Sequence, residues 1–314
     1  MSRSVTVFAP SPTLRVTVEP TTGGEVEIHL HPGGQGVWVA RMAAHLGARV
    51  RLCLPLGGEA GTALAALLTD EGLQPRAVST AGTSATVVLD HRGYEGEQDA
   101  EKGGRVAASS SRLTRHEIDD LYTAAITSAL DSAVLVLTGP EHEAVLPADV
   151  FGRLAADARG QGTKVVADLS GAALEHALRG GVDLLKIAHD ELPGEDGEAG
   201  ADDEAELLRR AGRLRERGAG TVLVTRAAQP PLVLTESGAH RLEVPSFTAV
   251  QFRGAGDSMS GAVAARLAQG ADVLSAIRTA AAAGAVNVTR RGYGTGHADA
   301  VEAVARRVEV HRVD

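Results

Sequence analysis

The apolar residues of the chain follow two periods. Short runs that are almost entirely apolar, such as residues 50–56, 133–137 and 221–225, are typical of strands buried on both faces of a parallel sheet. Segments with helical periodicity alternate with them. We expect further buried strands at 164–168 and 184–187, and helices at 36–47, 62–71, 115–131, 147–160, 204–218, 258–270, 273–289 and 298–305. This alternation predicts an α/β fold, with a central mostly parallel sheet, right-handed crossovers and helices on both faces.

A second pattern lies near the beginning of the chain. Residues 25–31 alternate strictly between polar and apolar, which indicates a strand with one exposed face. Residues 4–18 also favour a strand, and residues 83–91 and 105–108 are candidate partners. We expect a small antiparallel sheet apart from the main one. The predicted organisation is one domain over residues 1–314, with lid strands from about 11–31 and 83–108.

Composition narrows the class of protein. A chain of 314 residues, 44% of them hydrophobic, is long enough to bury roughly three quarters of its unfolded surface without disulfides. Its single cysteine, Cys53, cannot form an internal disulfide, which favours a reducing compartment. The chain shows neither a signal peptide nor an apolar run of membrane-spanning length, so we expect a soluble cytoplasmic protein with no membrane partner.

The charge distribution argues against a nucleic-acid partner. The formal net charge is −9, whereas binding to nucleic acid depends on clustered Lys and Arg. Residues 194–203 form an acidic, glycine-rich run, for which a solvated surface loop is the simplest interpretation.

The segment Arg253-Gly254-Ala255-Gly256-Asp257-Ser258 precedes a long Ala-rich helix. Small residues allow backbone N–H groups to converge at a helix start, where the helix dipole also favours an anion. An acidic residue placed in such a site needs a function, and accepting a proton from an attacking hydroxyl is one. Asp257 is therefore either a general base or simply a helix cap.

A second glycine cluster is Gly33-Gly34-Gln35-Gly36-Val37-Trp38-Val39-Ala40. Glycines permit tight turns and close approach of the backbone to a ligand, although a plain strand-to-helix turn would use them too. The segment is not the dinucleotide fingerprint, because it lacks the Gly-x-Gly-x-x-Gly spacing after the first strand of a sheet. It is not a P-loop either, because no Gly-Lys-Ser/Thr follows.

Together the two clusters resemble the ribokinase-like, or PfkB-type, carbohydrate kinases, and among them the 1-phosphofructokinase and tagatose-6-phosphate kinase branch. The first resembles Gly-Ala-Gly-Asp of that family and the second Gly-Gly-x-Gly-x-Asn-x-Ala. The resemblance extends along nearly the whole chain, through residues 11–18, 168–171, 186–192 and 284–289.

The resemblance implies a ribokinase-like fold and phosphorylation of a sugar or sugar-phosphate hydroxyl by ATP and Mg²⁺. Asp257 would be the general base, and the N–H groups of Gly254, Ala255 and Gly256 the anion hole. Glu191 would place Mg²⁺ through water. The resemblance also implies a homodimer formed through the lid. Residues implied to bind ATP are Lys186, Glu191, Thr225, Arg226 and Asn287, and those implied to bind the acceptor are Arg15, Gly33, Gly34, Gln35, Trp38 and Arg105.

The chain departs from the family pattern in the lid. Arg15, Trp38 and Gln35 stand where the family branch has Asp, Asn and Lys, so the contacts of the usual sugar phosphate are changed. Arg15 either binds a carboxylate or phosphate or is a surface charge of the lid. Trp38 either belongs to the core or stacks on a sugar.

Other lid residues keep two interpretations. Arg92 and Arg105 either bind a substrate phosphate or are edge-strand charges. His29 and His31 could form a metal pair, but exposed lid residues or substrate contacts fit their pattern as well.

The nucleotide side departs as well. Ala188 replaces a family Asn, Phe252 replaces a Thr, and the turn at 226–231 contains no glycine, while Arg226 and Arg253 add positive charge. These changes leave a second hypothesis open, a non-catalytic sensor that binds a sugar phosphate or nucleotide on the same fold. A nucleotide-dependent dehydrogenase is disfavoured, because the dinucleotide fingerprint is missing.

Overall fold

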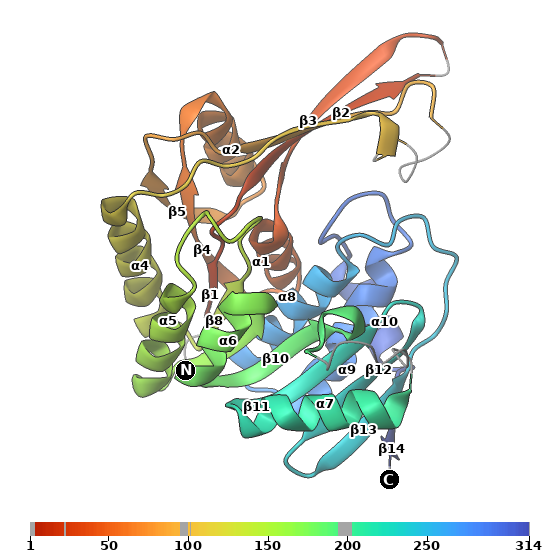
Figure 1. The fold of residues 1–314 in the computed structure, drawn as a ribbon. Helices are drawn as coiled ribbons and strands as arrows, with labels where there is room; N and C mark the ends of the chain where they lie inside the picture. Colours follow the sequence, from red (N-terminus) through yellow and green to blue (C-terminus); the bar gives the residue numbers. More distant parts are fainter. Residues whose placement is uncertain (1–3, 22, 95–99, 101, 194–202, 314) are drawn as a thin grey trace.

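The computed structural model describes residues 4–21, 23–94, 100, 102–193 and 203–313, and within them two β-sheets organise the chain (Figure 1). The acidic run predicted at 194–203 lies outside the described residues except for Asp203. The ten strands of the larger sheet are, in spatial order, β14 (Glu309–Val313), β13 (Gly238–Glu243), β12 (Gln229–Thr235), β11 (Ala219–Arg226), β10 (Val182–Ala188), β9 (Lys164–Asp168), β8 (Val134–Thr138), β1 (Ser4–Phe8), β4 (Arg49–Leu56) and β5 (Gln74–Ser79).

Seven strands of this sheet, from β5 to β11, run parallel, and β12, β13 and β14 extend it as an antiparallel edge. Alternate residues of the central strands enter two cores on opposite faces, as Val134 and Val136 do on one side and Leu135 and Leu137 on the other. The predicted α/β class with a mostly parallel sheet is therefore confirmed.

Helices cover both faces. One face carries α1 (Gln35–His45), α2 (Gly58–Asp70), α8 (Ala255–Ala268), α9 (Val273–Asn287) and α10 (Ala298–Ala305), and the other α4 (Arg115–Leu130), α5 (Asp149–Gly160), α6 (Gly171–Gly180) and α7 (Glu204–Glu216). The helix predicted at 115–131 begins at a capping box, in which Thr114 and Glu117 satisfy each other's backbone N–H groups. Within the described ranges no helix is long and apolar enough to cross a membrane.

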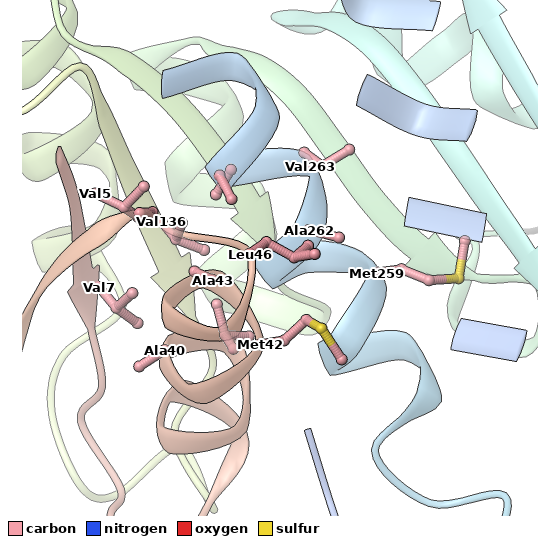
Figure 2. Packing of buried hydrophobic residues seen from close by; sticks show 14 of the residues in the cluster. Val5, Val7, Ala40, Met42, Ala43, Leu46, Val136, Met259, Ala262 and Val263 are labelled. Atoms are coloured by element: carbon pink, nitrogen blue, oxygen red, sulfur yellow. The ribbon is translucent and has the colours of Figure 1, made fainter. Parts of the chain in front are cut away.

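Helix α8 is buried on nearly all sides, because its small residues let α1 and α9 approach closely. Figure 2 shows Met42 and Ala43 of α1 beside Met259 and Ala262 of α8. At Gly261 the contact involves backbone atoms, since an added Cβ would lie 2.4 Å from the carbonyl oxygen of Val39.

The smaller sheet is the lid sheet, in which the strands lie in the order β3 (Val26–Gly33), β2 (Thr13–Pro20), β6 (Ala85–Asp90) and β7 (Arg105–Ala108). It projects away from the main sheet (Figure 1). The prediction of an antiparallel sheet is wrong at one pairing, because β2 and β6 run parallel.

The single strand predicted at 4–18 is also wrong. The chain breaks between β1, near the middle of the main sheet, and β2, in the lid sheet. Pro10 and Pro12 lie at this break, and proline cannot donate to a strand ladder. The β-branched residues on both sides hid the change of sheet.

Candidate active site

The site is built on a row of polar residues across three neighbouring strands. Thr138, Asp168 and Lys186 are register partners at or near the carboxyl ends of β8, β9 and β10, and all three are buried. Ligand sites of open α/β sheets lie at this edge. The register of the sheet places the three residues side by side, so no loop is needed to bring their side chains together.

Asp168 joins this row to helix α8. Lys186 Nζ lies 3.0 Å from Asp168 Oδ1, and the Ser260 hydroxyl donates to Asp168 Oδ2 at 2.6 Å. Although burial lowers the pKa of Lys186, the carboxylates of Asp168 and Asp257 together hold it above its ordinary value. Lys186 is therefore a buried cation paired with Asp168.

The start of α8 lies directly above this pair. Gly254, at the N-cap, has left-handed backbone angles (φ 83°), and no side chain caps the helix. The first N–H groups of a helix have no carbonyl partner one turn earlier, and that of Ala255 makes only a 3.4 Å contact with the carbonyl of Phe252. A helix start of this kind can bind an anion.

Packing against Lys186 explains why position 256 is a glycine. A Cβ there would lie 2.8 Å from Lys186 Nζ, so any other residue would displace the buried ammonium or the turn. The turn and Lys186 are thus packed against each other, and positive charge lies immediately behind the N–H groups of the helix start.

Asp257 is the third residue of α8, and Gly254 is its N-cap, so the interpretation of Asp257 as the helix cap is wrong. Burial and the nearby Asp168 raise the pKa of Asp257 to about 7, against the opposing effects of Lys186 and a hydrogen bond from Gln35. Gln35 is itself held by the Gly139 N–H, which donates to its Oε1 at 2.7 Å. Asp257 is half-buried, and a carboxyl in this position that titrates near neutrality is suited to accept a proton.

The side chain of Asn287 is buried and makes its hydrogen bonds within the protein. It is completely buried and accepts hydrogen bonds from the Ser258 hydroxyl and the Thr295 N–H, while its own amide donates to the Arg253 carbonyl. It therefore ties the start of α8 to the loop after α9. Its predicted contact with ATP stays a prediction.

The other residues predicted to bind ATP lie at the ends of β10 and β11. Glu191, in the short 3-10 helix η1 (His189–Glu191), is exposed and accepts from the Ala188 N–H, and Thr225 is half-buried. The buried guanidinium of Arg226 bonds Glu204 and the Pro230 carbonyl, and its predicted contact with ATP stays a prediction. Its positive charge is thus neutralised by a protein carboxylate.

On the acceptor side the structure gathers an aromatic cluster. Trp38 of α1 stacks on Tyr293 at a centroid distance of 4.6 Å, and the Arg15 guanidinium lies 4.5 Å from the Tyr293 ring and donates to its hydroxyl. Arg15 is only 5% exposed, so its interpretation as a lid-surface charge is wrong. It links lid strand β2 to the loop that abuts Gly254.

Gly33 and Gly34 form the turn beside this cluster. A Cβ on Gly33 would lie 2.8 Å from Arg15 Cδ, and one on Gly34 would lie 2.5 Å from the Ser11 carbonyl oxygen. The predicted close backbone approach therefore exists, toward Arg15 and the β1–β2 connection. Its predicted contact with the acceptor stays a prediction.

Arg105 and the two lid histidines lie further out. Arg105 is exposed on β7, the edge strand of the lid sheet. His29 and His31 stack on each other, and His29 pairs with Glu27. Across the described part of the chain no three His, Cys, Asp or Glu side chains gather as metal ligands.

Comparison with known proteins shows the family of the chain. Residues 11–300 match the family model described as pfkB family carbohydrate kinase. The chain belongs to the pfkB family of carbohydrate kinases. The chain is 32% identical over 276 residues to the ATP-dependent 6-phosphofructokinase isozyme 2 of Mycobacterium tuberculosis, covering 86% of this chain and 78% of that protein.

Solved pfkB-like structures share the fold. Phosphofructokinase-2 from Escherichia coli superposes with a TM-score of 0.80 at 24% identity, covering 98% of this chain and 99% of that chain. A possible 1-phosphofructokinase from Thermotoga maritima gives a TM-score of 0.81 at 16% identity, with 99% and 100% covered. Ribokinase from Arabidopsis thaliana gives 0.72 at 16%, with 98% and 99% covered, so the fold is ribokinase-like.

Sequence reasoning missed three residues of this pfkB site. Asp168 had a signal, since it ends a predicted strand at the sheet edge where sites form. Ser260 had a weaker one, its spacing of four residues from Gly256, which places both on one side of α8. Tyr293 had none, because it comes from a loop without periodicity.

Proposed function

We propose that this carbohydrate kinase transfers a phosphoryl group from ATP, with Mg²⁺, to a hydroxyl of a sugar or sugar phosphate. Asp257 acts as the general base. The observation that carries the proposal is its half-buried position in the first turn of α8, where its pKa is raised to about 7. A base with this pKa is substantially deprotonated at neutral pH and still basic enough to accept a proton from a hydroxyl.

The anion hole of the proposal consists of the N–H groups of Gly254, Ala255 and Gly256. Their dipoles are fixed before reaction by the left-handed Gly254 and by Asn287, which bonds the Arg253 carbonyl. Preorganised donors stabilise charge that develops in the transition state without reorganising at that moment. The ammonium of Lys186, packed under Gly256, adds positive charge on the same side.

The residues present also fit Mg²⁺ and ATP. Mg²⁺ keeps several waters and takes few protein carboxylates, which suits the exposed Glu191, acting through water. Glycine at 256 lets the Lys186 ammonium pack against the helix start, which places positive charge beside the N–H groups that would bind a phosphate. Thr225, Asn287 and Lys186 would lie on the ATP side. When bound, Mg²⁺ neutralises charge on the phosphates.

The acceptor is proposed from the lid side. Gly33, Gly34, Gln35, Trp38 and Arg15 would border it, and Arg105 would contact a phosphate if the acceptor carries one. The Mycobacterium tuberculosis relative is named a 6-phosphofructokinase, which supports a sugar phosphate as the first class to test. The lid sheet would exclude water on closing.

The outer face of the lid sheet supports a homodimer. Val26, Ile28, Leu30 and Val106 are large, exposed apolar residues, and Ile28 is 61% and Val106 70% exposed. Leu30 and Val106 lie in one cross-strand row through Val16 and Val88. An apolar face of this kind is typical of an association surface, and we propose that two copies pair through it.

A second candidate is a sensor that binds ligand without turnover. The observation that favours it is the Arg15–Tyr293–Trp38 cluster, in a region that would have to admit the acceptor. A sensor would bind a nucleotide or sugar phosphate and release no ADP in the presence of any acceptor.

The deciding experiment is ADP release by the purified protein with Mg-ATP and a panel of acceptors. The panel contains fructose 6-phosphate, fructose 1-phosphate, tagatose 6-phosphate, free sugars, sugar acids and nucleosides. The Asp257→Asn variant should lose about 10²- to 10⁴-fold in kcat with nearly unchanged ATP affinity, because a general base acts mainly in the transition state.

Asp272→Asn is the matched control. Asp272 caps the neighbouring helix α9 through its side chain, which Asn can also do, so kcat should not change. Full kcat in Asp257→Asn would contradict the assignment of the base. ATP binding without turnover of any panel member would favour the sensor.

A further inference from the structure

The geometry points to Ser260 as a positioning residue that holds the Asp168–Lys186 pair beneath the phosphoryl-transfer site. This inference rests on the proposed function, and it concerns a residue that contacts neither ATP nor the acceptor in that proposal. Ser260 is 1% exposed and lies one helical turn after Gly256.

The first step is the division of Asp168 between two partners. Its Oδ1 binds Lys186 Nζ at 3.0 Å, and its Oδ2 accepts from the Ser260 hydroxyl at 2.6 Å. Each carboxylate oxygen thus has one strong donor, one from the sheet and one from α8. Two bonds in different directions fix the rotation of the carboxylate, whereas the lysine alone would leave it free to turn.

The second step is the consequence for Lys186. Its ammonium would be only 2.8 Å from a Cβ on Gly256, so its place under the helix start is closely set. Asp168 is the carboxylate that Lys186 directly contacts, and Ser260 fixes Asp168 to the same helix that provides the turn. A movement of the carboxylate would move the ammonium relative to the N–H groups of residues 254–256.

The third step excludes a purely local role for the hydroxyl. Ser260 also contacts the Gly256 carbonyl, but at 3.3 Å, the longer of its two contacts. The carbonyl of Gly256 already belongs to the helix ladder, whereas Asp168 Oδ2 would lose its close donor. The main effect of removing the hydroxyl therefore falls on Asp168.

The test compares Ser260→Ala, Ser260→Thr and wild type in steady-state kinetics, with the acceptor that the panel identifies. Ser260→Ala should lower kcat about tenfold and leave KM for ATP and acceptor within about twofold, because misplaced charge affects the transition state more than the bound substrates. Ser260→Thr keeps the donor and should recover most of kcat. A Ser260→Ala variant with wild-type kcat, or one that changes KM alone, would overturn the inference.

A double-mutant cycle with Asp168→Asn shows whether Ser260 acts through Asp168. If it does, Ser260→Ala should lower kcat much less in the Asp168→Asn background than in wild type. Additive losses in the double variant would show that Ser260 does not act through Asp168. Thr163→Val is the control, since Thr163 is another buried hydroxyl, just before the amino end of β9, bonded to the Ala129 carbonyl. It should leave kcat unchanged.

The same measurements separate this inference from the proposed function. If wild type and Asp257→Asn are equally inactive with every acceptor, the kinase proposal fails first. If wild type is active and Asp257→Asn is not, an unaffected Ser260→Ala variant removes only the role of Ser260. Thermal unfolding of each variant identifies a loss of kcat that comes from misfolding.

Discussion

The floor of the site and its lid are built in opposite ways. On the floor, Asp168, Lys186 and Ser260 are buried, and each bonds a group from a different strand or helix. On the lid, β7 is exposed along its whole length, and the ion pair of Asp90 with Arg92 lies within one turn at the surface. The comparison shows that charge on the floor is held by buried partners, whereas charge at the edge of the lid sheet is exposed to water.

The largest expected effect tests the ion pairs of the two regions. Lys186→Met removes one member of a buried pair and leaves the Asp168 carboxylate without a countercharge, so the free energy of unfolding should fall by about 3–5 kcal/mol. Arg92→Met removes one member of an exposed pair, which water and salt replace, and should leave the free energy of unfolding nearly unchanged.

Urea unfolding at neutral pH measures both variants. Similar losses in the two would show that burial does not distinguish the floor from the lid. An undiminished stability in Lys186→Met would mean that Asp168 finds another partner or takes up a proton.

The next effect concerns pH and Asp257. Its pKa is raised to about 7, so kcat/KM should fall about tenfold per pH unit below that value and level off above it. The effect on stability has the opposite sign. Between the ordinary pKa of 3.8 and about 7 the folded protein binds more protons than the unfolded chain, so the contribution of Asp257 to stability decreases as pH rises through this range.

Asp257→Asn removes this titration. The free energy of unfolding of the variant minus that of wild type should therefore be more positive at pH 8 than at pH 5. Urea unfolding of both proteins at the two pH values measures this difference. An equal difference at the two values would contradict the raised pKa. In the lid sheet the bond to Arg92 lowers the pKa of Asp90 to about 2, but both side chains are exposed to water, so this shift should add little to stability.

The smallest expected effect on chemistry comes from the outer face of the lid sheet. Ile28→Asp should convert a dimer to a monomer in light scattering while changing kcat little, because Ile28 faces away from Arg15. Its neighbour Glu27 alternates to the opposite face, so Glu27→Gln should keep the dimer. A monomeric wild type, or an Ile28→Asp dimer, would refute the proposed interface.

The sequence predicted the floor of the site better than the lid. Residues 164–168 were expected to form a strand, and β9 has these bounds, because a short apolar run beside a helical pattern has few other solutions. For Asp257 the segment alone left two interpretations, a general base and a helix cap, and its role as the base was implied by the family resemblance and stays a prediction.

What was missed depends on long-range contacts. The pairing of Ser260 with Asp168 joins residues 92 positions apart, and that of Arg15 with Tyr293 joins residues 278 apart. The pairing of Arg226 with Glu204 likewise joins residues 22 positions apart, and the predicted contact of Arg226 with ATP stays a prediction. Residue type alone does not reveal which of several nearby carboxylates or rings a long side chain will meet.

The backbone contact of Gly261 with Val39 has an evolutionary consequence. It fixes the distance between the helix that carries Gln35 and Trp38 and the helix that carries Asp257 by main-chain atoms, which substitution of side chains does not alter. Residues on the side of the proposed acceptor, such as Arg15 and Trp38, can therefore differ from the family pattern without changing the position of Asp257. A lineage of such proteins can exchange one substrate for another while inheriting the same chemistry.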